Sequence, residues 1–339
     1  MRIGITYDLK SDAPPPAGAP DDYQEEFDSP TTVEAVAAVL RGLGHEVVKL
    51  GDGRGLLRRL LSDPPDFVFN FAEGQGVGRS REARVPAVLE MLDIPYTGSD
   101  PLTLAVTLDK DCAKRLVESA GVNVPRSFVV KPGDDLDELA ARARLPYTAI
   151  VKPAWEGSSK GIRGRCVVDD AEGCIAAVER LRKDHAQPIL VEEYIQGEEL
   201  TVGIVGNAPP RVVGVLRVVP QLPTDRFVYS LEVKRDWRRQ VRYECPPRLA
   251  AGELEAVEQA ALQAYRTLGC RDVARVDFRL RDGVPYFLEV NPLPGLNPES
   301  GDLVILAGLA GWTYEELIRG VFEAALDRHA AKFQPTAAT

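Results

Sequence analysis

The feature of this chain that most constrains its fold is the alternation of apolar runs with helical patterns over the first hundred residues. Three runs predict buried strands and three segments predict helices: the strands are 2–7, 45–50 and 65–71, and the helices are 32–43, 56–61 and 85–92. This alternation predicts βαβ units around a parallel sheet. Ligands of such sheets bind beyond the carboxyl ends of the strands, so the segments after Tyr7 and Phe71 are candidate site regions.

The rest of the chain also predicts a mixture of helices and strands, so the protein is expected to be α/β. The predicted helices are 110–119, 171–183, 252–268 and 314–327, and the predicted strands are 127–130, 148–152, 162–168, 188–194, 200–205, 211–219, 274–280 and 285–290. A polar, aromatic loop is expected over 220–244. Boundaries near 108 and 206 divide the chain into an N-terminal unit (1–108), a central unit (109–206) and a C-terminal unit (207–339).

Composition and charge exclude several classes of protein. The 41 Lys and Arg residues against 51 Asp and Glu residues give a net charge of −10, so nucleic acid and anionic membranes are not expected partners. Five scattered cysteines and three histidines show neither zinc spacing nor a disulfide framework. The N-terminus lacks the apolar core of a signal peptide, and no apolar run is long enough to span a bilayer. A cytoplasmic protein is expected.

A segment rich in proline and carboxylates, residues 11–30, follows the first predicted strand. Its composition favours a disordered surface loop. Its place at the end of a strand keeps a second interpretation open, in which the segment closes over a substrate.

A Gly/Ser loop lies in the sequence IVKPAWEGSSKGI, residues 150–162. Glycines let backbone N–H groups converge on an anion, the serines add donors, and Lys152 supplies a positive charge, so the loop suits a polyphosphate. The pattern matches neither the Walker motif nor the dinucleotide fingerprint, and a plain hairpin turn remains an alternative.

Two later segments carry oxygen ligands. Asp277 lies on one predicted strand, and Glu289 and Asn291 lie two residues apart on the next, hence on one face. A hairpin would place all three together, and such oxygen ligands suit Mg²⁺. In VEEYIQGEELTV, residues 191–202, an edge strand and turn would suit an adenine, with Glu199 for ribose hydroxyls, although an acidic surface turn explains that pattern equally well.

Together these segments resemble the ATP-grasp superfamily and, within it, the D-alanine–D-alanine ligase family. The matching motifs occur in order, with the family's spacing: 94–110 (IPYTGSDPLTLAVTLDK), 151–162, 191–202, 229–234 (YSLEVK), 274–278 (ARVDF) and 288–300 (LEVNPLPGLNPES). The resemblance implies an ATP-grasp fold, with an N-terminal parallel-sheet domain, a central lid and a C-terminal part that carries the magnesium and substrate sites.

The resemblance also implies a role for individual residues. ATP would be held by Lys110, Lys152, Ser158, Ser159, Glu192, Glu199 and Lys234, and two Mg²⁺ ions, or Mn²⁺ in their place, by Asp277, Glu289 and Asn291. The catalytic residues would be Arg275, Lys234 and Ser158: Arg275 would stabilise the oxyanion of the tetrahedral intermediate, Lys234 would reach the γ-phosphate, and Ser158 would lie in the flexible loop that closes over the phosphates. Ser300 would bind the carboxylate of the amine-donating substrate.

The departures from the family pattern cluster where the amino acids would bind. The glutamate that follows the family's first strand has no clear match, although Glu25, Glu26 or Asp28 could replace it. The family's His-Gly turn reads Glu73-Gly74. The tyrosine after the loop lysine is Arg235, and Gly301 follows Ser300.

The resemblance implies an ATP-dependent ligase that joins a carboxylate to an amine through an acyl phosphate, with small molecules as partners and a homodimer as the family's common assembly. Because the departures surround the amino-acid pocket, a ligase of other amino acids or of a small-metabolite carboxylate is an alternative. A non-catalytic ATP-binding regulator is a further alternative, which would require a missing metal ligand or phosphate lysine.

Overall fold

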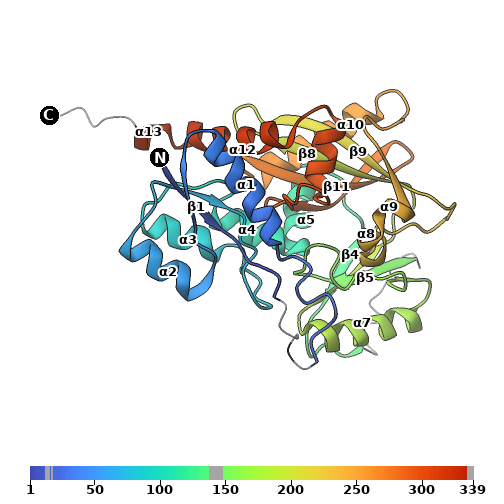
Figure 1. Ribbon diagram of the computed structural model, residues 1–339. Coiled ribbons are helices and arrows are strands. Elements are labelled where there is room, and N and C mark those ends of the chain that lie inside the picture. Colours follow the sequence, from blue (N-terminus) through green and yellow to red (C-terminus); the bar gives the residue numbers. More distant parts are fainter. Residues whose placement is uncertain (12–15, 17, 137–147, 334–339) are drawn as a thin grey trace.

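The computed structural model describes residues 1–11, 16, 18–136 and 148–333, which form three sheets with helices packed around them (Figure 1). The N-terminal sheet has the order β2-β1-β3 and is wholly parallel. It is built from β1 (Arg2–Thr6), β2 (Glu46–Lys49) and β3 (Phe67–Asn70), with helices α1 (Pro30–Gly42), α2 (Gly53–Ser62) and α3 (Arg84–Met91) between and after the strands. The predicted βαβ arrangement is confirmed.

The central sheet is antiparallel, with the order β4-β7-β5-β6. It contains β4 (Ser127–Val130), β5 (Ala149–Pro153), β6 (Val167–Val168) and β7 (Ile189–Glu193), and α7 (Ala171–His185) packs on it. The strand predicted over 162–168 is wrong for most of its length, because only Val167 and Val168 pair with β5. The residues before them form turns, in which Gly161 has a φ of 73°.

The third sheet is antiparallel and five-stranded, with the order β10-β9-β8-β11-β12. Its strands are β8 (Glu198–Val205), β9 (Arg211–Pro220), β10 (Val241–Glu244), β11 (Val273–Arg281) and β12 (Val284–Asn291). The strand β8, which the sequence placed in the central unit, pairs with β9 and β11. The reason is packing: Leu200, Val202 and Ile204 are fully buried in one core with Val276. The central sheet therefore ends before β8 rather than near residue 206.

Two helices of the structure were not predicted from the sequence. They are α4 (Pro101–Leu108), which leads into α5 (Lys110–Ser119), and α11 (Asp302–Leu309), which packs on β9. The segment predicted as a loop over 220–244 contains α8 (Leu231–Arg235), α9 (Trp237–Gln240) and β10.

The last helices run back to the N-terminal sheet. The helix α10 (Glu253–Thr267) covers the five-stranded sheet, and α12 (Tyr314–Arg328) and α13 (Ala330–Phe333) lie near the chain start (Figure 1). Phe322 of α12 packs edge-on against Phe67 of β3, with ring centroids 5.4 Å apart. One core therefore joins the N-terminal unit to the C-terminal end of the chain.

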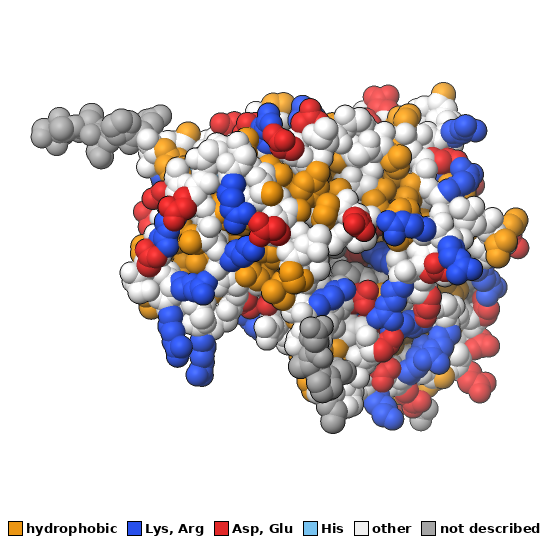
Figure 2. Space-filling model, in the orientation of Figure 1, with side chains coloured by type: hydrophobic (Ala, Val, Ile, Leu, Met, Phe, Trp, Pro, Cys, Tyr) orange, Lys and Arg blue, Asp and Glu red, His pale blue; other side chains and the backbone are white. Residues whose placement is uncertain are grey.

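The surface carries charges of both signs. On the face shown in Figure 2, Lys and Arg side chains alternate with Asp and Glu side chains, and apolar groups lie between them. In the part of the chain that the structure describes, no helix combines the length and the apolar character needed to cross a membrane.

Candidate active site

The hairpin of β11 and β12 carries the predicted oxygen ligands on one face. Asp277 lies opposite Glu289, and Arg275 lies opposite Asn291. The Asn291 side-chain amide donates to Asp277 Oδ2 at 3.1 Å. The predicted hairpin is confirmed, and it brings two carboxylates and an amide oxygen together, because side chains two residues apart point to the same side of a strand.

The two carboxylates of this hairpin differ in their electrostatic surroundings. Burial alone would raise the pKa of Glu289, but the positive charges of Lys110 and Lys152 hold that pKa far below its usual range. Lys110 Nζ lies 3.0 Å from Glu289 Oε2. For Asp277, burial outweighs the opposing effect of Arg275 and raises the pKa. Glu289 is therefore ionised at neutral pH and available to a cation.

Arg275 is held between two carboxylates. Its guanidinium lies 2.9 Å from Asp277 Oδ2 and 2.8 Å from Asp302 Oδ2. Asp302 also lies 3.5 Å from Lys234 Nζ, and it accepts a hydrogen bond from the Tyr229 hydroxyl at 3.1 Å. Asp302 thus orients two of the cations that the sequence singled out, Arg275 and Lys234. Sequence reasoning missed it, although it comes directly after Ser300 and Gly301.

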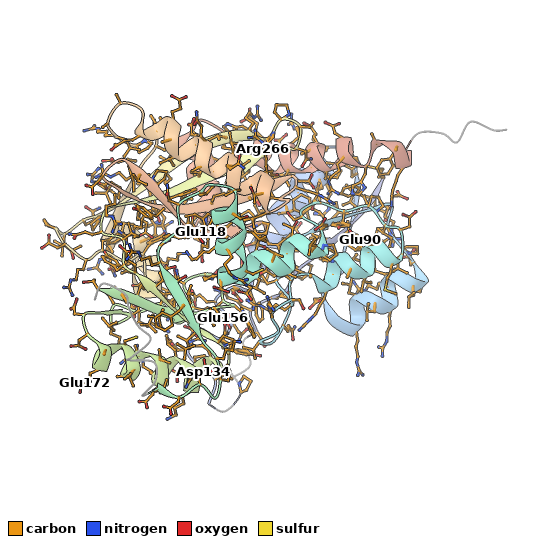
Figure 3. All side chains as sticks on the ribbon, turned by 180° about the vertical axis from the view of Figure 1, so that it is seen from behind. Glu90, Glu118, Asp134, Glu156, Glu172 and Arg266 are labelled. Atoms are coloured by element: carbon orange, nitrogen blue, oxygen red, sulfur yellow. The ribbon has the colours of Figure 1, made fainter. Side chains whose placement is uncertain are left out.

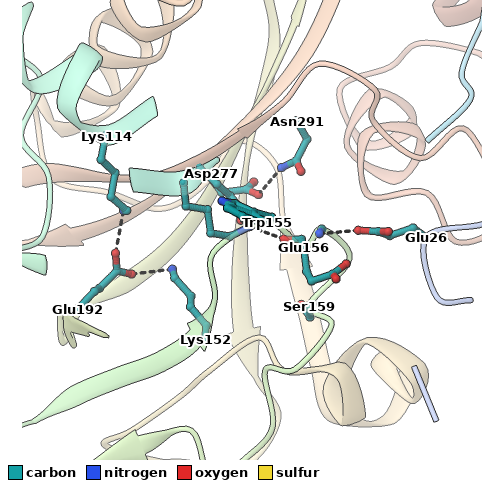
Figure 4. A network of polar contacts seen from close by, with 12 residues as sticks. Glu26, Lys114, Lys152, Trp155, Glu156, Ser159, Glu192, Asp277 and Asn291 are labelled. Carbon is teal, nitrogen blue, oxygen red and sulfur yellow. Dashed lines mark hydrogen bonds and ion pairs between the residues drawn. The ribbon is translucent and has the colours of Figure 1, made fainter. Parts of the chain in front are cut away.

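A buried ion cluster joins the central sheet to α5. Glu192 of β7 lies between Lys152, at 2.6 Å, and Lys114, at 2.9 Å (Figure 4). Lys114 was also missed, although it lies one helical turn after Lys110 on the same helix. Burial lowers its pKa to about 8, against the opposing effect of Glu192.

The interpretation of residues 191–193 as an edge strand is wrong. The strand β7 pairs with β4 on one side and with β5 on the other. Pairing across a sheet depends on distant segments, which is why the local pattern did not reveal it. The Glu192 carboxylate is committed to the two lysines, and Tyr194 and Ile195, which follow β7, line a neighbouring cavity.

A cavity of about 710 Å³ lies between the central sheet and the five-stranded sheet. Its lining combines apolar side chains, Ile150, Ile162, Tyr194, Ile195, Val228 and Leu288, with charged ones that include Lys152, Lys234, Arg275, Asp277 and Glu289. Glu199 also lines it and lies 2.8 Å from Arg279. A lining of apolar groups together with cations and oxygen ligands suits a nucleotide, whose base contacts apolar groups and whose phosphates contact charged ones, and we call this cavity the nucleotide-shaped cavity.

Comparison with known proteins decides the family. The family model for the D-ala D-ala ligase C-terminus matches residues 116–323. A D-alanine–D-alanine ligase of Aquifex aeolicus is 35% identical over 292 residues, which cover 85% of this chain and 92% of that protein. The chain belongs to the D-alanine–D-alanine ligase family.

Two further proteins are similar to this chain over most of their length. An uncharacterized protein of Sinorhizobium fredii is 34% identical over 306 residues, which cover 87% of this chain and 88% of that protein. A crystal structure of the D-alanine–D-alanine ligase of Bacillus anthracis complexed with ATP superposes with a TM-score of 0.73 at 25% identity. That match covers 98% of this chain and 99% of the solved chain. The ATP-grasp fold predicted from the sequence is therefore confirmed.

The Gly/Ser loop of this ligase-family member is bound by the acidic segment. Backbone N–H groups of Gly157 and Gly161 donate to the carboxylates of Glu26, at 2.5 Å, and Asp22, at 2.9 Å. The interpretation of the segment as disordered is wrong for residues 18–30, because these contacts fix it. The loop serines have positive φ angles, 48° for Ser158 and 59° for Ser159, as expected for a tight anion-binding turn.

Ser159 and Ser158 take different positions in this loop. The Ser159 hydroxyl donates to the Tyr229 carbonyl at 3.0 Å, which ties the loop to the segment before α8. Ser158 lines two cavities that meet at Arg275. Ser158 thus faces the cavities beside Arg275, whereas Ser159 lines the cavity between the central and five-stranded sheets.

The departures from the family pattern have structural explanations at three positions. Arg235 lies 3.0 Å from Asp21 and 2.7 Å from Glu25, so it anchors the acidic segment to α8. At Gly301, a Cβ atom would lie 2.4 Å from the Gly295 carbonyl oxygen, so only glycine fits. Ser300 precedes it on the surface, and both line a cavity beside Lys234 and Arg275.

Glu73, the third departure, lines a separate cavity of about 760 Å³, which we call the acidic pocket. Its lining includes charged groups, Glu26, Asp28, Glu73, Glu82, Lys110, Glu156, Arg275 and Glu289, the neutral amide of Asn291, and apolar groups, among them Phe71, Leu108, Leu293 and Leu296. Arg275 and Glu289 also line the nucleotide-shaped cavity. The two cavities therefore meet at these two residues.

Proposed function

We propose that this chain is an ATP-dependent carboxylate–amine ligase, which activates a small carboxylate as an acyl phosphate and joins it to an amine with release of ADP and phosphate. The observation that carries the proposal is the junction of the two cavities at Arg275 and Glu289. A group transferred from a nucleotide in one cavity would arrive at a carboxylate held in the other. Family membership supports the same reaction class.

ATP is proposed to occupy the nucleotide-shaped cavity. The base would lie among the apolar side chains beyond β7, and Glu199 would meet the ribose hydroxyls. Lys152 and Lys110 would neutralise phosphate charge, and Lys234 would reach the terminal phosphate from α8. Backbone N–H groups of the Ser158 loop would cover the phosphates and exclude water, which would otherwise hydrolyse an acyl phosphate.

The hairpin residues fit Mg²⁺, with Mn²⁺ as a substitute. Asp277 and Glu289 face each other on paired strands, Asn291 adds an amide oxygen, and the lowered pKa of Glu289 keeps that carboxylate ionised. When bound there, the metal would supply charge neutralisation at the transferred phosphate. Two ions are proposed, as in the family.

The chain's own groups account for the remaining steps. Arg275 would donate to the oxyanion that develops when the amine attacks the acyl phosphate, and Asp302 would keep the guanidinium in place. Ser300 and the backbone at Gly301 would bind the amine-donating substrate on the side of Lys234. No covalent enzyme intermediate is needed.

Phosphate release from Mg-ATP, measured with a panel of amino acids and with mass spectrometry of the products, tests the proposal. The wild-type protein should release phosphate only with a carboxylate substrate and form a peptide or amide. Lys152→Ala and Glu289→Gln should each abolish ligation while circular dichroism shows a retained fold. Wild-type turnover in either variant would show that the assigned residues are not the site. A panel that includes D-alanine also distinguishes a dipeptide of D-alanine from other acid–amine pairs.

A further inference from the structure

The acidic pocket contains carboxylates that the protein does not neutralise. Glu82 is 7% exposed and lines the pocket, yet no described residue forms a hydrogen bond or an ion pair with its side chain. The same holds for Glu73, which is partly buried beside it. A buried carboxylate without a partner is costly, so its presence points to a ligand that completes it.

The neighbouring carboxylates do have partners in the protein. Glu26 lies 2.7 Å from Arg81 and 3.2 Å from Lys160, and Glu156 pairs with the same two cations. The two cations of the lining are paired as well: Lys110 lies 3.0 Å from Glu289, and Arg275 lies 2.9 Å from Asp277. These cations are thus paired with other carboxylates, which leaves Glu73 and Glu82 without a partner among the described residues, while Asp28 has a hydrogen bond with the Thr32 side chain but no ion pair there.

The protonation equilibria reflect this excess of negative charge. Burial, and then the like charges of its neighbours, raises the pKa of Glu82 to about 8. Burial and the charge of Glu82 raise the pKa of Glu73 well above its ordinary value. Burial raises the pKa of Asp28 to about 7. A bound cation would relieve these interactions.

We propose that the carboxylate substrate of this ligase is an amino acid with a positively charged side chain, whose two cationic groups lie among Glu73, Glu82 and Asp28. The proposal rests on the proposed function and specifies its substrate class. The substrate carboxylate would lie at the Arg275 end of the pocket, where the two cavities meet. A single ammonium group, as in alanine, would leave most of the unpaired charge uncompensated.

The apolar part of the lining fits the methylene chain of such a substrate. Phe71, Leu108, Leu293 and Leu296 lie in the same cavity as the three carboxylates. A linear aliphatic side chain that ends in an ammonium or guanidinium group meets both surfaces, whereas a bare metal ion would leave the apolar surface without a contact.

The test compares cationic amino acids with neutral ones of matched length. Lysine, ornithine and arginine, in both configurations, are assayed against norleucine, norvaline, citrulline and D-alanine, with phosphate release as the readout. The cationic substrates should have a kcat/KM at least tenfold higher. Glu82→Gln and Glu73→Gln should each reduce this preference about tenfold, mainly through KM. Glu118→Gln is the matched control and should leave the preference unchanged, because this carboxylate, labelled in Figure 3, is exposed on α5 and is not among the residues that line the pocket.

A binding measurement keeps the proposal testable where turnover is lost. Calorimetric titration of the wild-type protein with lysine or arginine, with and without a non-hydrolysable ATP analogue, should show binding that Glu82→Gln weakens about tenfold. Equal turnover of neutral and cationic amino acids, with phosphate still released, would overturn the substrate class and leave the proposed function intact. Binding of cationic amino acids without any ATP turnover would contradict the proposed function instead. If Mg²⁺ alone bound to the wild-type protein and Glu82→Gln abolished that binding, the acidic pocket would be a metal site and the proposal would be overturned.

Discussion

The carboxylate of Glu26 lies 2.7 Å from the guanidinium of Arg81, although the two residues are 55 positions apart in the chain. The same carboxylate accepts a hydrogen bond from the backbone of Gly157. One side chain of the acidic segment thus connects the turn after β3 to the Gly/Ser loop of the central sheet. Both side chains are almost wholly buried, with exposed fractions of 4% for Glu26 and 1% for Arg81.

This arrangement predicts the effect of Glu26→Gln. Removing the charge leaves Arg81 and Lys160 with Glu156 as their remaining partner, so the free energy of unfolding should fall by about 3 kcal/mol in urea denaturation. The matched control is Glu25→Gln on the same segment, whose partner Arg235 is 39% exposed, and it should cost less than about 1 kcal/mol. If both variants lowered the free energy of unfolding equally, the buried pair of Glu26 and Arg81 would contribute no more to stability than the exposed pair of Glu25 and Arg235.

Asp302→Asn should show whether Asp302 positions Arg275 and Lys234 for catalysis without contributing to ATP binding. The substitution removes the charge that holds Arg275 and Lys234, so kcat should fall about 10- to 100-fold while the affinity for ATP changes by less than about threefold. Initial rates and a nucleotide-binding titration measure the two quantities. Asp327→Asn, at an exposed position of α12, serves as the control. An unchanged kcat in Asp302→Asn would contradict the positioning role.

The raised pKa of Glu82 predicts a pH-dependent stability. An acid whose pKa is raised on folding contributes stability that is fully present below its ordinary pKa near 4.5 and is lost as pH rises through about 8. The ligand-free protein should therefore lose stability as pH rises from about 4.5 to about 8. Arg81 and Lys110 oppose this effect, while Glu26 and Glu156 add to it.

Glu82→Gln should remove that part of the pH dependence. Because glutamine carries no charge, thermal denaturation should show a variant that is more stable than the wild type at pH 8.5, by about 1–3 kcal/mol, and less so at pH 6. If the variant were less stable than the wild type at pH 8.5, the ionised Glu82 carboxylate would not destabilise the ligand-free protein, and this prediction would be wrong. The same substitution is expected to weaken substrate binding, so stability and activity would change in opposite directions.

Gly301→Ala should destabilise the turn that leads into α11. Its new Cβ would lie 2.4 Å from a backbone oxygen that cannot move aside, and a cost of about 2 kcal/mol is expected. Gly308→Ala is the matched control, because it lies within α11 with open space around it and should stabilise by about 0.5–1 kcal/mol. Chemical denaturation of both variants measures the difference. A neutral result at Gly301 would show that the contact is relieved at little cost.

Local patterns were sufficient to predict most of the elements. The alternating apolar runs predicted the parallel N-terminal sheet, and a period of two placed Glu289 and Asn291 on one face, as the pairing of β11 and β12 confirms. These features depend on residues close together in the chain, whose spacing is written in the sequence. The assignment of β8 to the central unit failed, because its partners β9 and β11 are decided by which apolar face completes the larger core.

The sequence by itself determined the kind of chemistry, since the order of its motifs places the lysines, the Gly/Ser loop and the oxygen ligands in one family. Only the tertiary structure decided which charged side chains pair with one another and which remain unpaired. Asp302, Lys114 and Glu82 belong to no motif, and their roles depend on residues that are distant in the chain. Asp302 pairs with Arg275 and Lys234, and Lys114 pairs with Glu192. Glu82 is left without a partner because Glu26 and Glu156 pair with the nearby cation Arg81. The physical reason is that the protonation state and interaction energy of a side chain depend on its burial and on nearby charges, and both arise only when distant segments of the chain meet.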